Sequence, residues 1–190
     1  MNGHGAESGR EPRDDELVAG ARAGDREALD VLVARHHGVA YRVALGILAD
    51  PDAAADATQE AFLKAMRGLA GFRGDARFRT WLLTIVSNEA RTQLRRGVRR
   101  RERSMDEVGE MGDGHRGADE LVAEGDACRR ARGLLERLPE KQRLAVQLRV
   151  DEGLSFREVG EIIGSSEGAA RVNYHHGIKR LRAWMEDTWA

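Results

Sequence analysis

Cysteine and proline are scarce in this chain of 190 residues, and long apolar runs are missing. The single cysteine, Cys128, excludes an internal disulfide bond and suits a reducing compartment. With only three prolines and abundant Ala, Leu, Arg and Glu, helix is favoured throughout, and no alternating β-branched run predicts a sheet. No apolar segment approaches the roughly 20 residues that cross a bilayer, and the polar first residues lack the apolar core of a secretory signal. We therefore expect an all-α, cytoplasmic protein.

The charges are unevenly distributed, although the formal net charge is only −1. Ten arginines and three acidic residues lie in 73–103, whereas eight acidic residues and one arginine lie in 104–126. The chain is therefore polarised. Within the basic block, 95–103 holds six arginines, which we expect to bind phosphates in a salt-dependent way without reading sequence. A solvated helix end stabilised by the helix dipole fits the same run, and both interpretations can hold together.

Capping residues and apolar spacing predict four helices in the first half of the chain. Asp14 or Asp15 favours the start of the first helix, and Asp25 caps a second that reaches about Ala49. Asp50 and Pro51 open a third helix to about Leu69, and a fourth spans roughly 78–100 after a short loop at 71–76. The positions expected to face the core are Leu29, Leu32, Val33, Val39, Val43, Ala44, Ile47, Leu48, Phe62, Ala65, Met66, Leu69, Phe78, Trp81, Leu82, Ile85, Val86 and Leu94.

The last third of the chain has the pattern of a helix-turn-helix. Ser155 and Glu158 form a capping box, Gly160 sits where two helices must approach closely, and Gly164 allows the backbone to leave the first helix. Ser166 can cap the next helix, whose basic and polar groups suit the DNA major groove. Taken alone, the segment also fits a plain helical hairpin with a solvated face.

The whole layout predicts two small helical domains joined by a flexible acidic linker. We expect a disordered tail at 1–13, a first domain at 14–101, the linker at 102–117 and a second domain at 118–190. Glycines and a low apolar content mark the linker.

Four motifs in this order resemble the extracytoplasmic-function (ECF) sigma factors, the smallest group of the bacterial sigma-70 family. DPDAAADATQEAFLKAMR at 50–67 is similar to region 2.2, and the segment 72–96 to regions 2.3 and 2.4. LLERLPEKQRLAVQLR at 134–149 is similar to region 4.1, and the segment 155–182 to region 4.2. The resemblance implies a subunit without catalytic residues or cofactors that binds core RNA polymerase and promoter DNA.

The resemblance assigns a polar face of the third helix to the clamp helices of the polymerase β′ subunit, and the second domain to the β flap. A solvated face carrying a Glu60–Lys64 ion pair fits the same spacing. The residues of the polymerase-binding face are Asp56, Gln59, Glu60 and Lys64.

The fourth helix has a polar face that mixes Arg with amide and hydroxyl groups, which can hold phosphates and touch base edges. The resemblance assigns this face to the −10 promoter element and the loop at 71–77 to a pocket for a flipped base. We expect Phe78 and Trp81 to be core residues, whereas Phe72 fits either role. The −10 candidates are Phe72, Arg73, Asp75, Arg77, Asn88, Arg91, Thr92, Arg95 and Arg96.

The resemblance assigns the last helix to the −35 element. This chain has RVNYHHG at 171–177 where the family often has KSRLHRA, so the promoter sequence cannot be carried over. Asn173 has the groups to pair with adenine through two hydrogen bonds, a hypothesis that an unaltered −35 preference in Asn173→Arg would contradict. The −35 candidates are Ser165, Ser166, Glu167, Gly168, Ala170, Arg171, Asn173, His175 and Lys179.

No metal site is expected. His36–His37 and His175–His176 are adjacent pairs whose side chains point about 100° apart on a helix, so neither pair chelates well. No nucleophile–base pair or glycine-rich phosphate loop predicts an enzyme. The resemblance also implies an anti-sigma partner, which would carry any zinc ligands itself. Cys128 is expected to be a small buried residue.

Two questions stay open at this point. The acidic linker is either a solubilising tether or, as the resemblance implies, a nucleic-acid mimic in the polymerase cleft. A helix-turn-helix regulator that binds duplex DNA by itself, usually as a dimer on paired half-sites, is the alternative to a sigma subunit.

Overall fold

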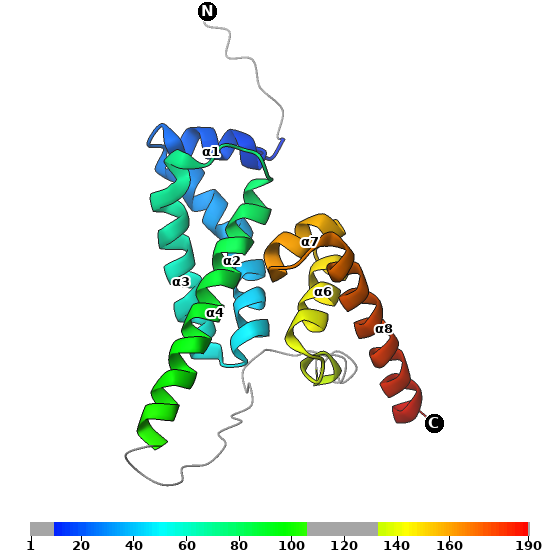
Figure 1. Ribbon diagram of the computed structural model, residues 1–190. Coiled ribbons are helices and arrows are strands. Elements are labelled where there is room, and N and C mark those ends of the chain that lie inside the picture. Colours follow the sequence, from blue (N-terminus) through cyan, green and yellow to red (C-terminus); the bar gives the residue numbers. More distant parts are fainter. Residues whose placement is uncertain (1–9, 106–132, 190) are drawn as a thin grey trace, which may run out of the picture.

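The computed structural model describes residues 10–105 and 133–189, and all the regular structure in these two parts is helical (Figure 1). The predicted linker beyond residue 105 and Cys128 lie outside the described residues. No helix in the described parts is both long and apolar enough to span a membrane. The helices are α1 Asp14–Arg22, α2 Arg26–Leu48, α3 Pro51–Gly68, the 3-10 turn η1 Leu69–Gly71, α4 Phe78–Met105, α6 Glu140–Val150, α7 Phe156–Ile163 and α8 Glu167–Trp189.

The predicted helix starts are confirmed because they depend on local hydrogen bonds. The Asp25 carboxylate accepts from the backbone N–H of Glu27 at 2.9 Å. The Asp50 carboxylate accepts from the N–H of Ala53 at 2.9 Å, and Pro51 occupies the first turn of α3. Each cap satisfies a backbone donor that has no partner within its helix. Arg13, in the predicted disordered tail, is already the N-cap of α1.

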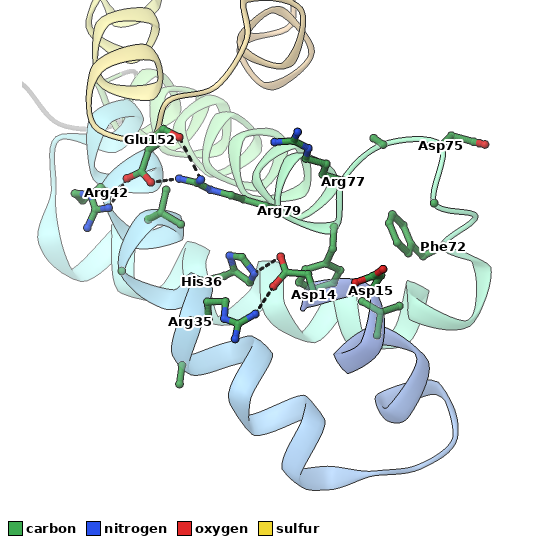
Figure 2. A pocket seen from close by; sticks show the side chains of 17 residues that line it. Asp14, Asp15, Arg35, His36, Arg42, Phe72, Asp75, Arg77, Arg79 and Glu152 are labelled. Carbon is green, nitrogen blue, oxygen red and sulfur yellow. Dashed lines mark hydrogen bonds and ion pairs between the residues drawn. The ribbon is translucent and has the colours of Figure 1, made fainter. Parts of the chain in front are cut away.

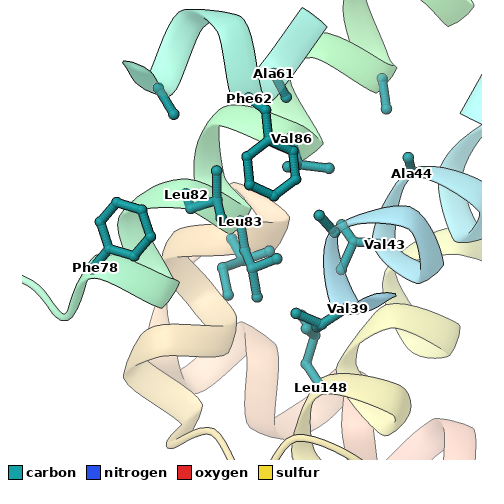
Figure 3. Close-up of a cluster of buried hydrophobic side chains, with 14 of the residues drawn as sticks. Val39, Val43, Ala44, Ala61, Phe62, Phe78, Leu82, Leu83, Val86 and Leu148 are labelled. Carbon is teal, nitrogen blue, oxygen red and sulfur yellow. The ribbon is translucent and has the colours of Figure 1, made fainter. Parts of the chain in front are cut away.

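α2, α3 and α4 form a bundle, with α1 lying across one end (Figure 1). Its core includes Phe62 from α3 and Leu82 from α4 (Figure 3). With Leu32 from α2, these side chains are at most 7% exposed. The prediction for Leu94 is wrong, because this residue is 39% exposed. α4 also continues to Met105 rather than ending near residue 100.

The helix-turn-helix of α7 and α8 is confirmed, and both helices pack against α6. The capping box at Ser155 and Glu158 is present, and Gly164 takes a φ of 64° as the turn requires. A Cβ on Gly160 would lie 2.9 Å from the carbonyl oxygen of Ser165, so the predicted close approach of the two helices is real.

The two halves of the chain pack against each other, a contact that the sequence did not predict. α7 lies against α4, and α6 lies against α2. Leu148 of α6 joins the same buried cluster as Val39 and Val43 of α2 (Figure 3). Gly46 permits the approach, because a Cβ there would lie 3.0 Å from Cδ2 of Leu144.

Candidate nucleic-acid interface

The polar face of α4 is partly prearranged by hydrogen bonds within the helix. The Thr92 hydroxyl donates to the carbonyl oxygen of Asn88 at 2.8 Å, and Arg95 Nη2 donates to Thr92 Oγ1 at 3.1 Å. Asn88, Arg95 and Arg96 are exposed. The solvent-facing side of α4 therefore carries an amide, a hydroxyl and guanidinium groups close together. This combination suits contacts to phosphates and base edges.

Arg91 belongs to the same predicted face but is covered by the second domain. Its side chain is 21% exposed, and its Nε lies 3.2 Å from Glu140 Oε1 of α6. Its Nη1 donates to the carbonyl oxygen of Ile162 at 3.4 Å, while its Nη2 is buried without a hydrogen-bond partner. In this arrangement Arg91 is not available to DNA.

Ser87, one turn before Arg91 on α4, is fully buried. Its hydroxyl donates to the carbonyl oxygen of Ile162, at the C-terminal end of α7, at 2.6 Å. Nearby, the Thr80 hydroxyl donates to Glu158 Oε1 at 3.1 Å. The side chains of α4 that touch α7 therefore satisfy polar groups of the helix-turn-helix.

The loop before α4 borders an open pocket between α1, α2 and the start of α4 (Figure 2). Phe72 is half-buried, with its ring centroid 4.9 Å from that of Trp81 and 6.0 Å from that of Phe78. Phe78 is buried as predicted, and Trp81 is half-buried. Phe72 thus lies on the edge of an aromatic cluster, with one part exposed to the pocket.

The charged residues of this loop point into solvent. Arg73 pairs with Asp75 at 3.1 Å, and both side chains are at least 75% exposed. Arg77 is also exposed and lies 4.0 Å from Glu158. Such exposed pairs contribute little to stability, so these side chains are free to move toward a ligand.

A histidine lies in the pocket wall opposite the loop. His36 is 4% exposed, with its Nε2 2.8 Å from Asp14 Oδ2, and Arg35 donates to the other carboxylate oxygen at 2.8 Å (Figure 2). Burial lowers the pKa of His36 below its usual 6.5, although Asp14 opposes this shift. His36 therefore serves as a structural hydrogen-bonding residue, and His37 stacks on Phe62.

Sequence reasoning missed two further guanidinium groups in this pocket. Arg42 of α2 and Arg79 of α4 both pair with the carboxylate of Glu152, which lies in the turn between α6 and α7 (Figure 2). Arg79 Nη1 also donates to the Glu152 carbonyl oxygen at 3.2 Å. Arg79 had been counted in the basic block, but only the tertiary structure brings it beside Arg42.

The polymerase-binding candidates lie on α3, away from this pocket. Asp56, Gln59 and Lys64 are exposed, and Glu60 is partly exposed. The alternative reading of this face, a Glu60–Lys64 pair, does not form: Lys64 Nζ bonds the carboxylate of Glu89 on α4, which is 6% exposed. A buried carboxylate needs a partner more than an exposed one does, so Glu89 holds the lysine.

The start of α8 is arranged for contacts outside the domain. Ser166 caps the helix, accepting from Ala169 N–H at 3.2 Å, and Arg171 pairs with Glu167 at 3.1 Å. Ser165 is partly exposed, and Gly168, His175 and Lys179 are exposed.

Two of the −35 candidates on α8 differ from expectation. Ala170 is fully buried in the core, so its assignment to DNA contact is wrong. Asn173 is half-buried, and its amide nitrogen donates to the Ala169 carbonyl oxygen at 2.8 Å. Base reading by Asn173 therefore requires another rotamer.

Comparison with known proteins gives two family matches in chain order. Residues 32–101 match the family model "Sigma-70 region 2", and residues 128–181 match "Sigma-70, region 4". The chain is 35% identical over 174 residues to the ECF RNA polymerase sigma factor SigM of Mycobacterium tuberculosis, covering 91% of this chain and 85% of that protein. It is 32% identical over 170 residues to the RNA polymerase sigma-H factor of Pseudomonas aeruginosa, covering 84% and 86%.

Solved structures share the fold. CnrH in complex with the cytosolic domain of CnrY superposes with a TM-score of 0.64 at 24% identity, covering 92% of this chain and 97% of that chain. The sigma factor RpoE in complex with the anti-sigma factor NepR from Bartonella quintana gives 0.68 at 22% identity, covering 83% and 96%.

Proposed function

Because this chain belongs to the family of ECF RNA polymerase sigma factors, we propose that it binds core RNA polymerase and directs initiation at promoters through residues on α3, α4 and α8. The observation that carries the proposal is the presence of both sigma regions in one chain, each with its predicted helices. A regulator that binds DNA alone has no need of the region 2 bundle. The same family membership supports the proposal that the chain acts in the cytoplasm and has no enzymatic activity of its own.

The polymerase-binding face is the exposed side of α3. Asp56 and Gln59 are available there, while Glu60 and Lys64 border them and Leu63 adds an apolar side chain that is 39% exposed. A charged rim beside an exposed leucine suits a helix-to-helix interface with the β′ clamp helices. The second domain would bind the β flap.

The −10 element would be bound by the face of α4 around Asn88 and Arg95, together with the loop of Phe72, Arg73, Asp75 and Arg77. The exposed guanidinium groups would bind phosphates of the DNA backbone, and the half-buried ring of Phe72 offers a surface on which a flipped base can stack. Arg91 and the neighbouring Arg96 and Thr92 extend this face once Arg91 is free.

The −35 element would be bound by the first turns of α8. Ser165, Ser166, Glu167, Gly168 and Arg171 lie at the helix start, and His175 and Lys179 follow on its exposed side. A helix N-terminus with polar groups suits entry into the major groove.

An anti-sigma protein is the proposed regulator. One solved structure that shares this fold is the sigma factor RpoE of Bartonella quintana in complex with the anti-sigma factor NepR. We propose that a partner of this class binds the chain and keeps it from polymerase; co-purification that returned only polymerase subunits, whether or not the cell is induced, would count against it.

Run-off transcription with purified core polymerase on a library of promoter fragments tests the proposal. Specific initiation should require the chain and should fall about tenfold or more in Asn88→Ala/Arg95→Ala, since each lost base or phosphate contact costs about 1–3 kcal/mol. These two residues are chosen because both are exposed and are joined through Thr92 by hydrogen bonds within α4. Arg26→Ala, which removes an exposed arginine at the start of α2, is the control and should initiate normally.

Core binding is measured separately with Asp56→Ala/Gln59→Ala, which should weaken it while leaving the helix content unchanged. A wild-type chain that failed to bind core polymerase and bound duplex DNA tightly by itself would overturn the proposal in favour of a conventional regulator.

A further inference from the structure

The second domain covers part of the proposed −10 surface. Arg91 of α4 lies under α7 and α6, where Ile162 and Glu140 accept its hydrogen bonds, and the adjacent Ser87 also donates to Ile162. Promoter DNA cannot reach the Arg91 side chain while the domains remain packed. The contact therefore competes with the proposed use of this face.

The contact is held by carboxylates of the second domain on guanidinium groups of the first. Glu140 meets Arg91, and Glu152 meets both Arg42 and Arg79. The side chain of Glu152 is only 12% exposed, and its two oxygens are shared between the two guanidinium groups (Figure 2). An acidic group held between two arginines has the charge and geometry of a bound phosphodiester oxygen pair.

The same two arginines line the open pocket that Phe72 borders (Figure 2). A DNA strand whose flipped base stacked on Phe72 would carry its backbone along this pocket wall. Arg42 and Arg79 then lie where backbone phosphates would need neutralising, and neither residue was among the sequence-based candidates.

The structure points to a closed state of the free chain, and we propose that Glu152 occupies a phosphate-binding site formed by Arg42 and Arg79. When the domains separate, Glu152 leaves and a phosphate of single-stranded DNA takes its place. This inference rests on the proposed function, because it identifies the DNA strand as the ligand of a face that the second domain covers.

The closed state also has an apolar part that can be disturbed without changing charge. Gly46 on α2 faces Leu144 and Gln147 of α6, and a Cβ at position 46 would lie 3.0 and 3.3 Å from them. Arg143 of α6 donates to the Gly46 carbonyl oxygen, with its Nε at 3.1 Å. A longer side chain at position 46 acts as a wedge between the domains, and it favours the helix itself.

The test measures domain separation and DNA binding in the full-length chain. Donor and acceptor dyes are attached at Asp30→Cys on α2 and Arg180→Cys on α8, two exposed positions, in a Cys128→Ser background. The DNA probe is a fluorescein-labelled 15-nucleotide single strand of mixed sequence, followed by anisotropy in an unlabelled chain.

Glu152→Gln should lower energy transfer and raise affinity for the probe by about threefold or more, because a ligand that needs the open form binds in proportion to its population. Gly46→Gln should do the same with Glu152 intact. Glu161→Gln removes an equal charge from an exposed position on α7, where Glu161 pairs with Arg157, and should change neither reading.

The phosphate site itself is tested by Glu152→Gln/Arg79→Gln. This variant should open like Glu152→Gln and lose the gain in DNA affinity. Unchanged energy transfer in both Glu152→Gln and Gly46→Gln would refute the closed state, and a gain that survived loss of Arg79 would refute the phosphate site. Neither reading uses polymerase, so failure here is distinct from failure in the core-binding and transcription assays.

Discussion

A single methyl group at position 160 should disrupt the helix-turn-helix. A Cβ there would lie 2.9 Å from Ser165 O, 3.1 Å from the carbonyl carbon of Ser166 and 3.2 Å from the backbone nitrogen of Glu167. All three atoms belong to the backbone of the turn, which cannot move aside as a flexible side chain can. Gly160→Ala must therefore push α7 and α8 apart.

The magnitude follows from two opposing effects. Replacing a helical glycine with alanine contributes up to about 1 kcal/mol of stability through helix propensity. Overpacking a closely packed site costs about 1–3 kcal/mol, and contacts to rigid backbone belong at the upper end of that range. We expect Gly160→Ala to lower the free energy of unfolding by about 1–2 kcal/mol.

Gly168→Ala is the matched control. Gly168 lies in the first turn of α8, in the same domain as Gly160. A Cβ at Gly168 would have no neighbour within 4 Å. It should leave stability unchanged or raise it by up to about 1 kcal/mol. Urea unfolding followed by circular dichroism measures both variants, and equal midpoints would refute the close-approach argument.

Two further predictions concern stability. Burial lowers the pKa of His36, against the pull of Asp14, so the folded state favours the neutral ring. The neutral ring of His36 contributes its full stability above the unfolded-state pKa of about 6.5, and this stability is lost as the pH falls through the lowered pKa of the folded state. The melting temperature of His36→Gln should therefore depend less on pH than that of the wild type between about pH 5 and 7. Ser155→Ala removes the hydroxyl half of the capping box with Glu158 and should cost about 1 kcal/mol in urea unfolding. A loss below about 0.3 kcal/mol would indicate that Glu158 alone supports the start of α7.

Sequence reasoning succeeded where a structural feature depends on neighbours in the chain. Asp25, Asp50 and Ser155 start their helices by bonding backbone groups two or three residues away, and Gly164 takes the left-handed conformation that its turn needs. The helix-turn-helix and the two sigma regions could be identified for this reason, since their signals are short-range.

Sequence reasoning failed where the partner of a residue comes from a distant part of the chain. The spacing offered Glu60, one turn away, as an alternative partner for Lys64, but Lys64 pairs with the buried Glu89 of α4. Ala170 lies on the correct helix for DNA contact but on its buried side. Helical periodicity predicts which residues share one face of a helix. Which residues at the edge of that face are buried depends on the helix that packs against it.

The sequence by itself determined the helices of the described parts, their caps and the order of the two sigma regions. Only the tertiary structure decided that the second domain lies on α4, that Glu152 sits between Arg42 and Arg79, and that Arg91 is covered. The physical reason is distance along the chain: these contacts join residues 49 to 110 positions apart. Their formation depends on the summed burial and charge of two surfaces rather than on any local pattern.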